Sequence, residues 1–252
     1  MYNCCKCFPG LSFLPVLLVS GYSTTFFITY TIAVLQKHTY AIFTYISDAG
    51  ALMPENGVFS QMLNLGAFVA LAFFYVRHRQ VREICEMHNS RRKLRMLSKV
   101  CWYLGIIVSI SSTVVGNFPV HQAMAMHAVG AITGFVSISS WMLLQAYMSF
   151  KLYPLIGNSY INCIRVIFLT ISLITFSTCI ITAVIAFQRY KGHNILKWDP
   201  EDSDYELHAV SVIMEWTFVH STLAYFLTFA YELKDVSFEE PVIKINNVNF
   251  VT

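Results

Sequence analysis

The stretch INCIRVIFLTISLITFSTCIITAVIAF, residues 161–187, decides the fold class, because it is a long apolar run with one charged side chain, Arg165. A helix needs about 20 predominantly apolar residues to cross the hydrocarbon layer of a bilayer. The run is longer than this and is continuous, whereas a membrane-spanning β-strand alternates polar and apolar residues. It therefore predicts a transmembrane α-helix.

Five similar runs elsewhere extend this prediction to the whole chain. The composition agrees, because 56% of the residues are hydrophobic and 12% are charged, about half the charged fraction of a soluble domain. The net charge of +3 is too small to indicate nucleic acid as a partner. We predict an all-α membrane protein, a six-transmembrane-helix bundle in one domain, residues 1–252, with a short C-terminal tail. The predicted helices are 11–35, 58–76, 97–116, 124–147, 161–187 and 208–231, and the tail is 232–252.

The distribution of Lys and Arg predicts the orientation, because these residues are retained on the cytoplasmic side of a membrane. With both termini in the cytosol, all but four of the 17 Lys and Arg residues fall in cytosolic segments or adjacent helix ends. The exceptions are Lys37, Arg189, Lys191 and Lys197. We therefore expect both termini to be cytosolic.

Two features of the expected cytosolic face suggest contacts with the membrane. Cysteines that precede a membrane helix can be S-palmitoylated, and ordinary reduced thiols are the equally weighted alternative. The basic segment 77–95 could bind an anionic lipid or phosphoinositide, at about 1 kcal/mol for each basic residue, or its charges could only set the topology. The candidate acylation sites are Cys4, Cys5 and Cys7. The candidate lipid contacts are Arg77, Arg79, Arg82, Arg91, Arg92, Lys93 and Arg95.

Ionisable residues gather on the opposite, luminal side. His208, Ser211 and Glu215 have i, i+3, i+7 spacing and share one helix face. A carboxyl group two turns below a helix end is costly in a bilayer unless it is protonated, paired or in a wet cavity. The candidate luminal polar cluster comprises Asp48, Glu55, His121, His127, His208 and Glu215.

Three uses of this cluster compete. The histidines and a carboxylate could bind zinc and activate water, although no two histidines have i, i+4 spacing. They could titrate in an acidic lumen and sense pH. They could instead cap helices and form hydrogen bonds across the bundle, which is the interpretation that the residue pattern favours. We assign no residue to catalysis, a metal or a cofactor.

The first luminal loop contains YISDAGALMPENG, residues 45–57. Its Gly50, Pro54 and Gly57 favour a structured turn, and Asp48 could cap backbone amides there. We predict a lid that packs over the luminal ends of the fourth and sixth helices and brings Asp48 or Glu55 toward their histidines. Within the apolar runs, we expect interhelical hydrogen bonds from Asn64, Asn117 and Gln145.

Several segments together resemble the DRAM proteins, the damage-regulated autophagy modulators of the Frag/DRAM/Sfk group of six-span proteins. They are YISDAGALMPENGVFSQMLN at 45–64, GNF at 116–118, LKWDPEDSDYELHAVSVIMEW at 196–216 and FLTF at 226–229. The resemblance implies a lysosomal or endolysosomal multi-pass membrane protein that promotes autophagy, with apoptosis as a linked outcome. It supplies no catalytic residues.

The leading hypothesis is therefore a non-enzymatic membrane protein that acts through membrane lipids or membrane protein partners. A second hypothesis is a lipid-handling protein or transporter with a luminal cavity. The residues predicted to line it are Asp48, Glu55, His127, His208 and Glu215. A third is an intramembrane metal-dependent hydrolase. Other endomembranes and the plasma membrane remain alternative locations.

Overall fold

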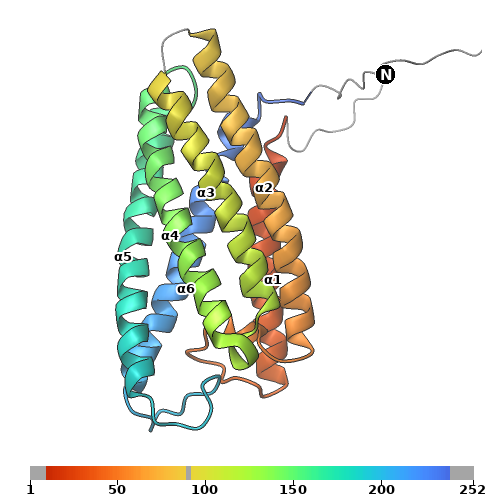
Figure 1. Ribbon diagram of the computed structural model, residues 1–252, viewed down its shortest axis with the longest axis vertical. Coiled ribbons are helices and arrows are strands. Elements are labelled where there is room, and N and C mark those ends of the chain that lie inside the picture. Colours follow the sequence, from red (N-terminus) through yellow and green to blue (C-terminus); the bar gives the residue numbers. More distant parts are fainter. Residues whose placement is uncertain (1–9, 89–91, 239–252) are drawn as a thin grey trace, which may run out of the picture.

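The computed structural model describes residues 10–88 and 92–238, which are almost entirely helical (Figure 1). Six helices in this part of the chain are long and apolar enough to cross a membrane. The sixth span, Tyr205–Leu233, includes a short final helix. The all-α, six-helix membrane class predicted from the apolar runs is confirmed. The helices are α1 (Phe13–Leu35), α2 (Glu55–Met87), α3 (Arg92–Asn117), α4 (Val120–Leu152), α5 (Ser159–Arg189), α6 (Tyr205–Leu227) and the short α7 (Ala230–Leu233).

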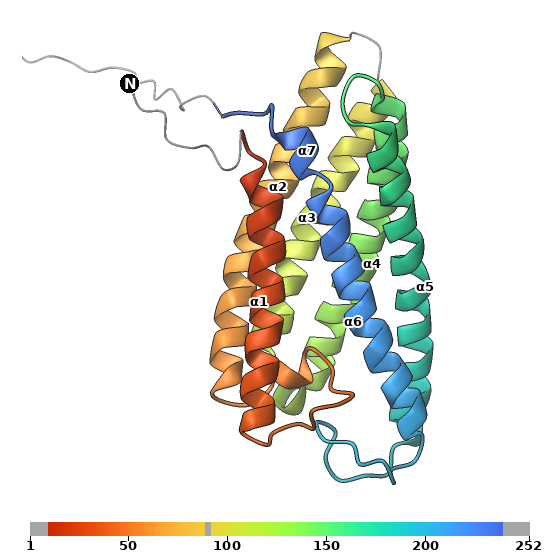
Figure 2. The same ribbon diagram turned by 180° about the vertical axis from the view of Figure 1, so that it is seen from behind.

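The six long helices form a closed ring. Each packs against its neighbour in sequence, and α6 packs against α1. The start of α1 and α7 lie at the same end of the ring, here called the terminal end (Figure 2). Leu11 N–H donates hydrogen bonds to the carbonyl oxygens of Leu233 (3.0 Å) and Val236 (2.9 Å), which ties the two ends of the described chain together. The opposite end, here called the distal end, carries the loops 36–54 and 190–204.

The second helix extends well beyond the predicted limit at residue 76. It continues to Met87, and α3 begins at Arg92, so most of the basic segment 77–95 is helical. Ion pairs at i, i+4 spacing support the added turns, namely Arg79 with Glu83 (2.7 Å) and Arg82 with Glu86 (2.8 Å). The hydropathy of this segment is low, which is why the apolar run marked only the membrane portion of the helix.

Aromatic side chains fill the centre of the ring toward the terminal end. The Trp141 ring stacks on Phe226 at 5.2 Å and meets Phe74 edge-on at 5.1 Å, while Phe73 contacts Phe226 and Phe229 edge-on. All five rings are buried. Edge-to-face and stacked pairs each add about 0.5–1.5 kcal/mol beyond the burial of their apolar area.

Close approach of the helices depends on small residues at specific positions. A Cβ at Gly105 of α3 would lie 2.5 Å from the Phe74 ring of α2, so only glycine permits this contact.

The predicted interhelical hydrogen bonds are also present. The amides of Asn64 and Asn117 join α2 to α3 (3.0 and 3.1 Å), and Gln145 of α4 accepts from Arg77 of α2 (3.1 Å).

Candidate functional sites at the two ends of the ring

At the distal end, the loop 36–54 is bonded to α6 at three points. The Nε2 atom of His208 donates to the Phe43 carbonyl (3.0 Å), and Trp216 Nε1 donates to the Thr44 carbonyl (2.9 Å). Two turns from His208, Oε2 of Glu215 accepts from the backbone N–H of Ile46 (2.8 Å). The shared face of His208 and Glu215 therefore holds the backbone of this loop.

A stack of aromatic rings covers His208. Trp198, from the loop 190–204, lies parallel to the imidazole with ring centres 4.3 Å apart, and Tyr190 stacks on the other face of Trp198 at 4.1 Å. Tyr45 meets the imidazole edge-on at 5.1 Å, and its hydroxyl bonds Ser211. The buried Nδ1 atom of His208 has no hydrogen-bond partner.

The loop 36–54 packs as the predicted lid over both helices. Besides its bonds to α6, Ala51 packs against Val120, the first residue of α4, and against Leu196. Glu55 does not act as predicted. It is the first residue of α2, and its buried carboxylate pairs with His38 of the loop (2.6 Å) rather than with a histidine of α4 or α6.

The candidate luminal polar cluster therefore divides into separate contacts. His208, Glu215 and the buried Asp48 gather at the loop, whereas His127 donates from Nδ1 to the Phe118 carbonyl (2.8 Å) at the α3–α4 turn. His121 is exposed. Within residues 10–88 and 92–238, no three His, Cys, Asp or Glu side chains lie close enough to hold a metal ion, so the hydrolase hypothesis finds no ligand set there.

Asp48 sits in an environment that opposes its negative charge. Burial, reinforced by the nearby Glu215 carboxyl, raises the pKa of Asp48 well above its usual range. No Lys or Arg side chain is among the residues that line the cavity beside Glu215. The distal end thus holds two carboxyl groups close together in a largely apolar setting.

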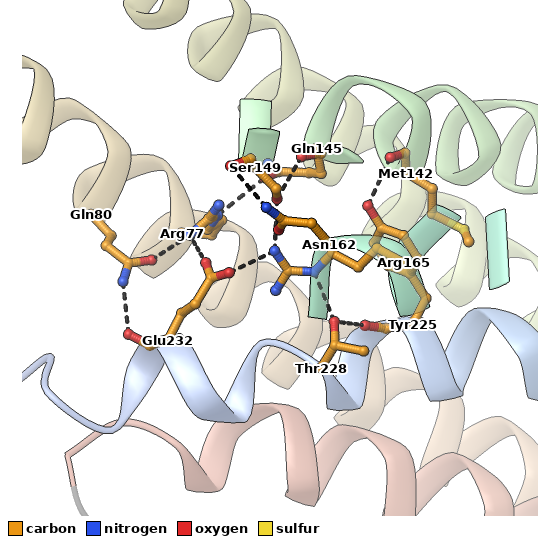
Figure 3. A network of polar contacts seen from close by, with 10 residues as sticks. All are labelled: Arg77, Gln80, Met142, Gln145, Ser149, Asn162, Arg165, Tyr225, Thr228 and Glu232. Atoms are coloured by element: carbon orange, nitrogen blue, oxygen red, sulfur yellow. Dashed lines mark hydrogen bonds and ion pairs between the residues drawn. The ribbon is translucent and has the colours of Figure 1, made fainter. Parts of the chain in front are cut away.

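At the terminal end, a buried ionic network joins α2, α5 and α7 (Figure 3). One oxygen of Glu232 binds NH1 of Arg77 and the other binds NH1 of Arg165, both at 2.6 Å. All three side chains are at most 2% exposed. Two guanidinium groups thus share one carboxylate inside the protein.

Further polar groups extend this network, although NH2 of Arg77 and NH2 of Arg165 have no hydrogen-bond partner. Gln80 accepts from Arg77 (2.7 Å) and donates to the Glu232 carbonyl (2.8 Å), while Ser149 and Thr228 accept from Arg165 (2.6 and 2.9 Å). The Phe229 ring lies 3.8 Å from the Arg165 guanidinium carbon and 4.9 Å from that of Arg77. Cation–π contact and hydrogen bonds therefore offset part of the cost of burying the charges.

The backbone near Gly157 is shaped around the same carboxylate. Gly157 has a φ of +82°, and a Cβ there would lie 2.9 Å from Oε1 of Glu232. Any other residue would be both strained and crowded at this position. The side chain of Asn158 then caps α5 by accepting from Tyr160 N–H (2.8 Å), which starts the helix that carries Arg165.

Sequence analysis did not find this network. Arg77 was a candidate lipid contact, Arg165 counted only as a topology charge, and Glu232 was assigned to the start of the tail. A signal was present, because Arg165 lies in an otherwise uncharged apolar run, where a charge requires a partner or a polar cavity. The partner is more than 60 positions away, so spacing along one helix could not identify it.

The network corrects one predicted lipid contact. Arg77 is 0% exposed, so its guanidinium binds Glu232 instead of a lipid headgroup. Arg79 and Arg82 are exposed beside their glutamate partners, and Arg92, Lys93 and Arg95 are exposed at the start of α3. Cys4, Cys5, Cys7 and Arg91 lie outside the described residues.

An apolar cavity of about 180 Å³ lies inside the ring, toward the distal end. Its walls come from α1, α2, α3, α4 and α6 and from the loop 36–54. Glu215, His127 and Tyr22 are its ionisable lining residues, whereas Asp48, Glu55 and His208 do not line it. A cavity beside Glu215 is therefore present, but three of its five predicted lining residues are elsewhere, and apolar side chains form most of its wall.

The fold and these sites define a six-span membrane protein with a structured distal loop and a buried ionic network. Residues 10–236 match the Frag1/DRAM/Sfk1/Cwh43P N-terminal domain. The chain is 33% identical to human DNA damage-regulated autophagy modulator protein 1. It is also 33% identical to human DNA damage-regulated autophagy modulator protein 2. These matches cover 90% of this chain and 93% and 86% of the two relatives. The chain belongs to the Frag1/DRAM/Sfk1 family.

A more distant relative shows a shorter match. The modulator of macroautophagy TMEM150B-B from Xenopus laevis is 30% identical over 49% of this chain and 50% of its own length. No solved structure matches the chain.

Proposed function

We propose that this protein is a multi-pass protein of lysosomal or endolysosomal membranes that promotes autophagy without catalysing a reaction. The observation that supports the proposal most is the similarity over 90% of the chain to relatives named autophagy modulators. The six membrane-spanning helices are consistent with residence in a membrane.

In this proposal both termini face the cytosol and the distal loops face the lumen. The exposed basic residues Arg92, Lys93 and Arg95 at the terminal end would then lie near the anionic cytoplasmic leaflet, where they would favour contact with an anionic lipid. The protein would act through such lipids and through membrane protein partners that bind the exposed helix faces.

Deletion of the protein tests the proposal. In starved cells, autophagic flux is measured as the accumulation of a lipidated autophagosome marker when lysosomal proteases are inhibited. We expect a lower flux in the deleted cells and recovery when the full chain is expressed again. Unchanged flux would overturn the proposed role, and a fully active chain absent from endolysosomal fractions would overturn the proposed location.

A further inference from the structure

The lining of the cavity extends along α6. It runs from Glu215 to Phe226, which is about 16 Å at 1.5 Å per residue. The volume of the cavity is about 180 Å³. A lining of this length suits an unbranched hydrocarbon chain that runs along α6.

The lining makes the cavity unfavourable for water. Phe59 and Leu63 of α2, Phe135 and Ile138 of α4 and other apolar side chains form its walls. Apolar cavities of this kind stay dry and bind apolar molecules. The rings of Phe74 and Phe226, which contact each other edge-on, line the cavity toward the terminal end.

The distal part of the cavity carries the opposite chemistry. One oxygen of Glu215 accepts from Ile46 N–H, so the carboxyl group is held in place at the wall. Asp48 lies near enough to interact electrostatically with it. The lining contains no Lys or Arg, and His127 already donates from Nδ1 to a backbone carbonyl. The Glu215 carboxyl group therefore has no basic side chain beside it in the lining, and the site complements a cation.

We propose that the ring binds a single-chain lipid base, a long hydrocarbon chain that ends in a primary ammonium group. The chain lies between Ile138 and Phe226, and the ammonium group donates to the Glu215 carboxylate. No Lys or Arg of the lining pairs with Glu215, so the ammonium group of the ligand provides the positive charge there. Charge-assisted hydrogen bonds of this type are strong in a low-dielectric site. The site is independent of the proposed role in autophagy.

Photo-crosslinking of the full chain in lipid nanodiscs tests the site. The probe is a long-chain primary amine that carries a diazirine in the chain and a terminal alkyne. Matched probes carry an alcohol or a carboxylic acid in place of the amine. We expect saturable labelling by the amine probe on peptides of α4 and α6 that line the cavity, competed by the unlabelled amine and at least tenfold stronger than labelling by the other probes.

Two variants separate recognition of the amine from filling of the cavity. Glu215→Gln keeps an acceptor for Ile46 N–H but removes the charge, and should lower amine labelling at least tenfold while leaving alcohol labelling unchanged. Ala131→Leu narrows the cavity and should lower labelling by both probes. Glu206→Gln, an exposed change on the same helix, is the control and should label as the unaltered chain does.

Labelling is compared only between variants that have the same elution volume in size-exclusion chromatography and the same melting temperature as the unaltered chain. Equal labelling by the amine, alcohol and acid probes would mean that bulk lipid fills the cavity, and would overturn the proposal. Amine labelling that is unchanged in Glu215→Gln, or that maps to peptides outside the cavity, would also overturn it. If Ala131→Leu does not fold, the Glu215→Gln comparison still decides.

Discussion

At the residue scale, Glu232 is the side chain whose role is clearest from its contacts. It pairs with two buried guanidinium groups that come from different helices and balances one of their two positive charges. Replacing a buried ion pair by apolar groups can be neutral, whereas removing one partner leaves a buried charge uncompensated. The stability of the terminal end therefore depends on this single carboxylate.

Substitution of Glu232 by Gln should strongly destabilise the protein. The amide carries no charge to pair with Arg77 and Arg165, and breaking a buried ionic contact of this type costs about 3–5 kcal/mol. Thermal unfolding in nanodiscs measures the effect. Glu83→Gln is the control, because Glu83 pairs with Arg79 at an exposed site and its loss should change the melting temperature little. Equal melting temperatures for the two variants would contradict the assigned role.

The raised pKa of Asp48 predicts a dependence of stability on pH. Its folded-state pKa lies above the ordinary value of 3.8, so the folded protein binds the proton more tightly than the unfolded chain. The contribution of Asp48 is therefore most favourable at acidic pH and is lost as pH rises through the folded-state pKa. Melting temperatures at lysosomal and neutral pH should differ less in Asp48→Asn than in the unaltered chain. A larger difference in the variant would show that the sign is wrong.

At the scale of single elements, the distal loops form one unit with α6. The rings of Tyr190, Trp198 and His208 are stacked in sequence, and the loop 36–54 is bonded to α6 by three backbone atoms. Trp198 comes from the segment whose sequence most resembles the DRAM proteins. Trp198 is stacked between Tyr190 and His208, so it links the loop 190–204 to α6.

Trp198→Ala should loosen the distal end. The Trp198 side chain is 3% exposed, and truncation of a buried tryptophan costs about 3–5 kcal/mol. We expect faster proteolysis within the loop 190–204 and a lower melting temperature. Ile42→Ala is the matched control, since Ile42 is 65% exposed in the neighbouring loop. Cleavage at the same rate in both variants would show that the stack does not hold the loop.

At the scale of the whole molecule, hydropathy alone predicted six helices, because a bilayer requires about 20 apolar residues for each span. The ends of the helices were less predictable. The last three turns of α2 are polar and lie beyond the apolar run, and their charged side chains pair along the helix.

The sites were predicted to different extents for a physical reason. His208 and Glu215 share a helix face, which their spacing reveals, and both contact the lid that the turn residues predicted. Arg77, Arg165 and Glu232 come from three helices, and their contact depends on how the ring closes. Hydropathy and spacing contain no information on that closure.

The predicted orientation can be tested on intact endolysosomes. An epitope tag at the C-terminus should be removed by added protease without detergent, because the terminal end is expected to face the cytosol. A tag placed after Glu201, in the exposed loop 190–204, should be protected until detergent is added. The reverse pattern would contradict the orientation.

The proposed promotion of autophagy requires the ring that the Glu232 network stabilises. It is tested by autophagic flux in starved cells that lack the protein and express either the unaltered chain, Glu83→Gln or Glu232→Gln. We expect the first two to restore flux and Glu232→Gln to leave it low. Equal flux with and without the unaltered chain would contradict the proposed function.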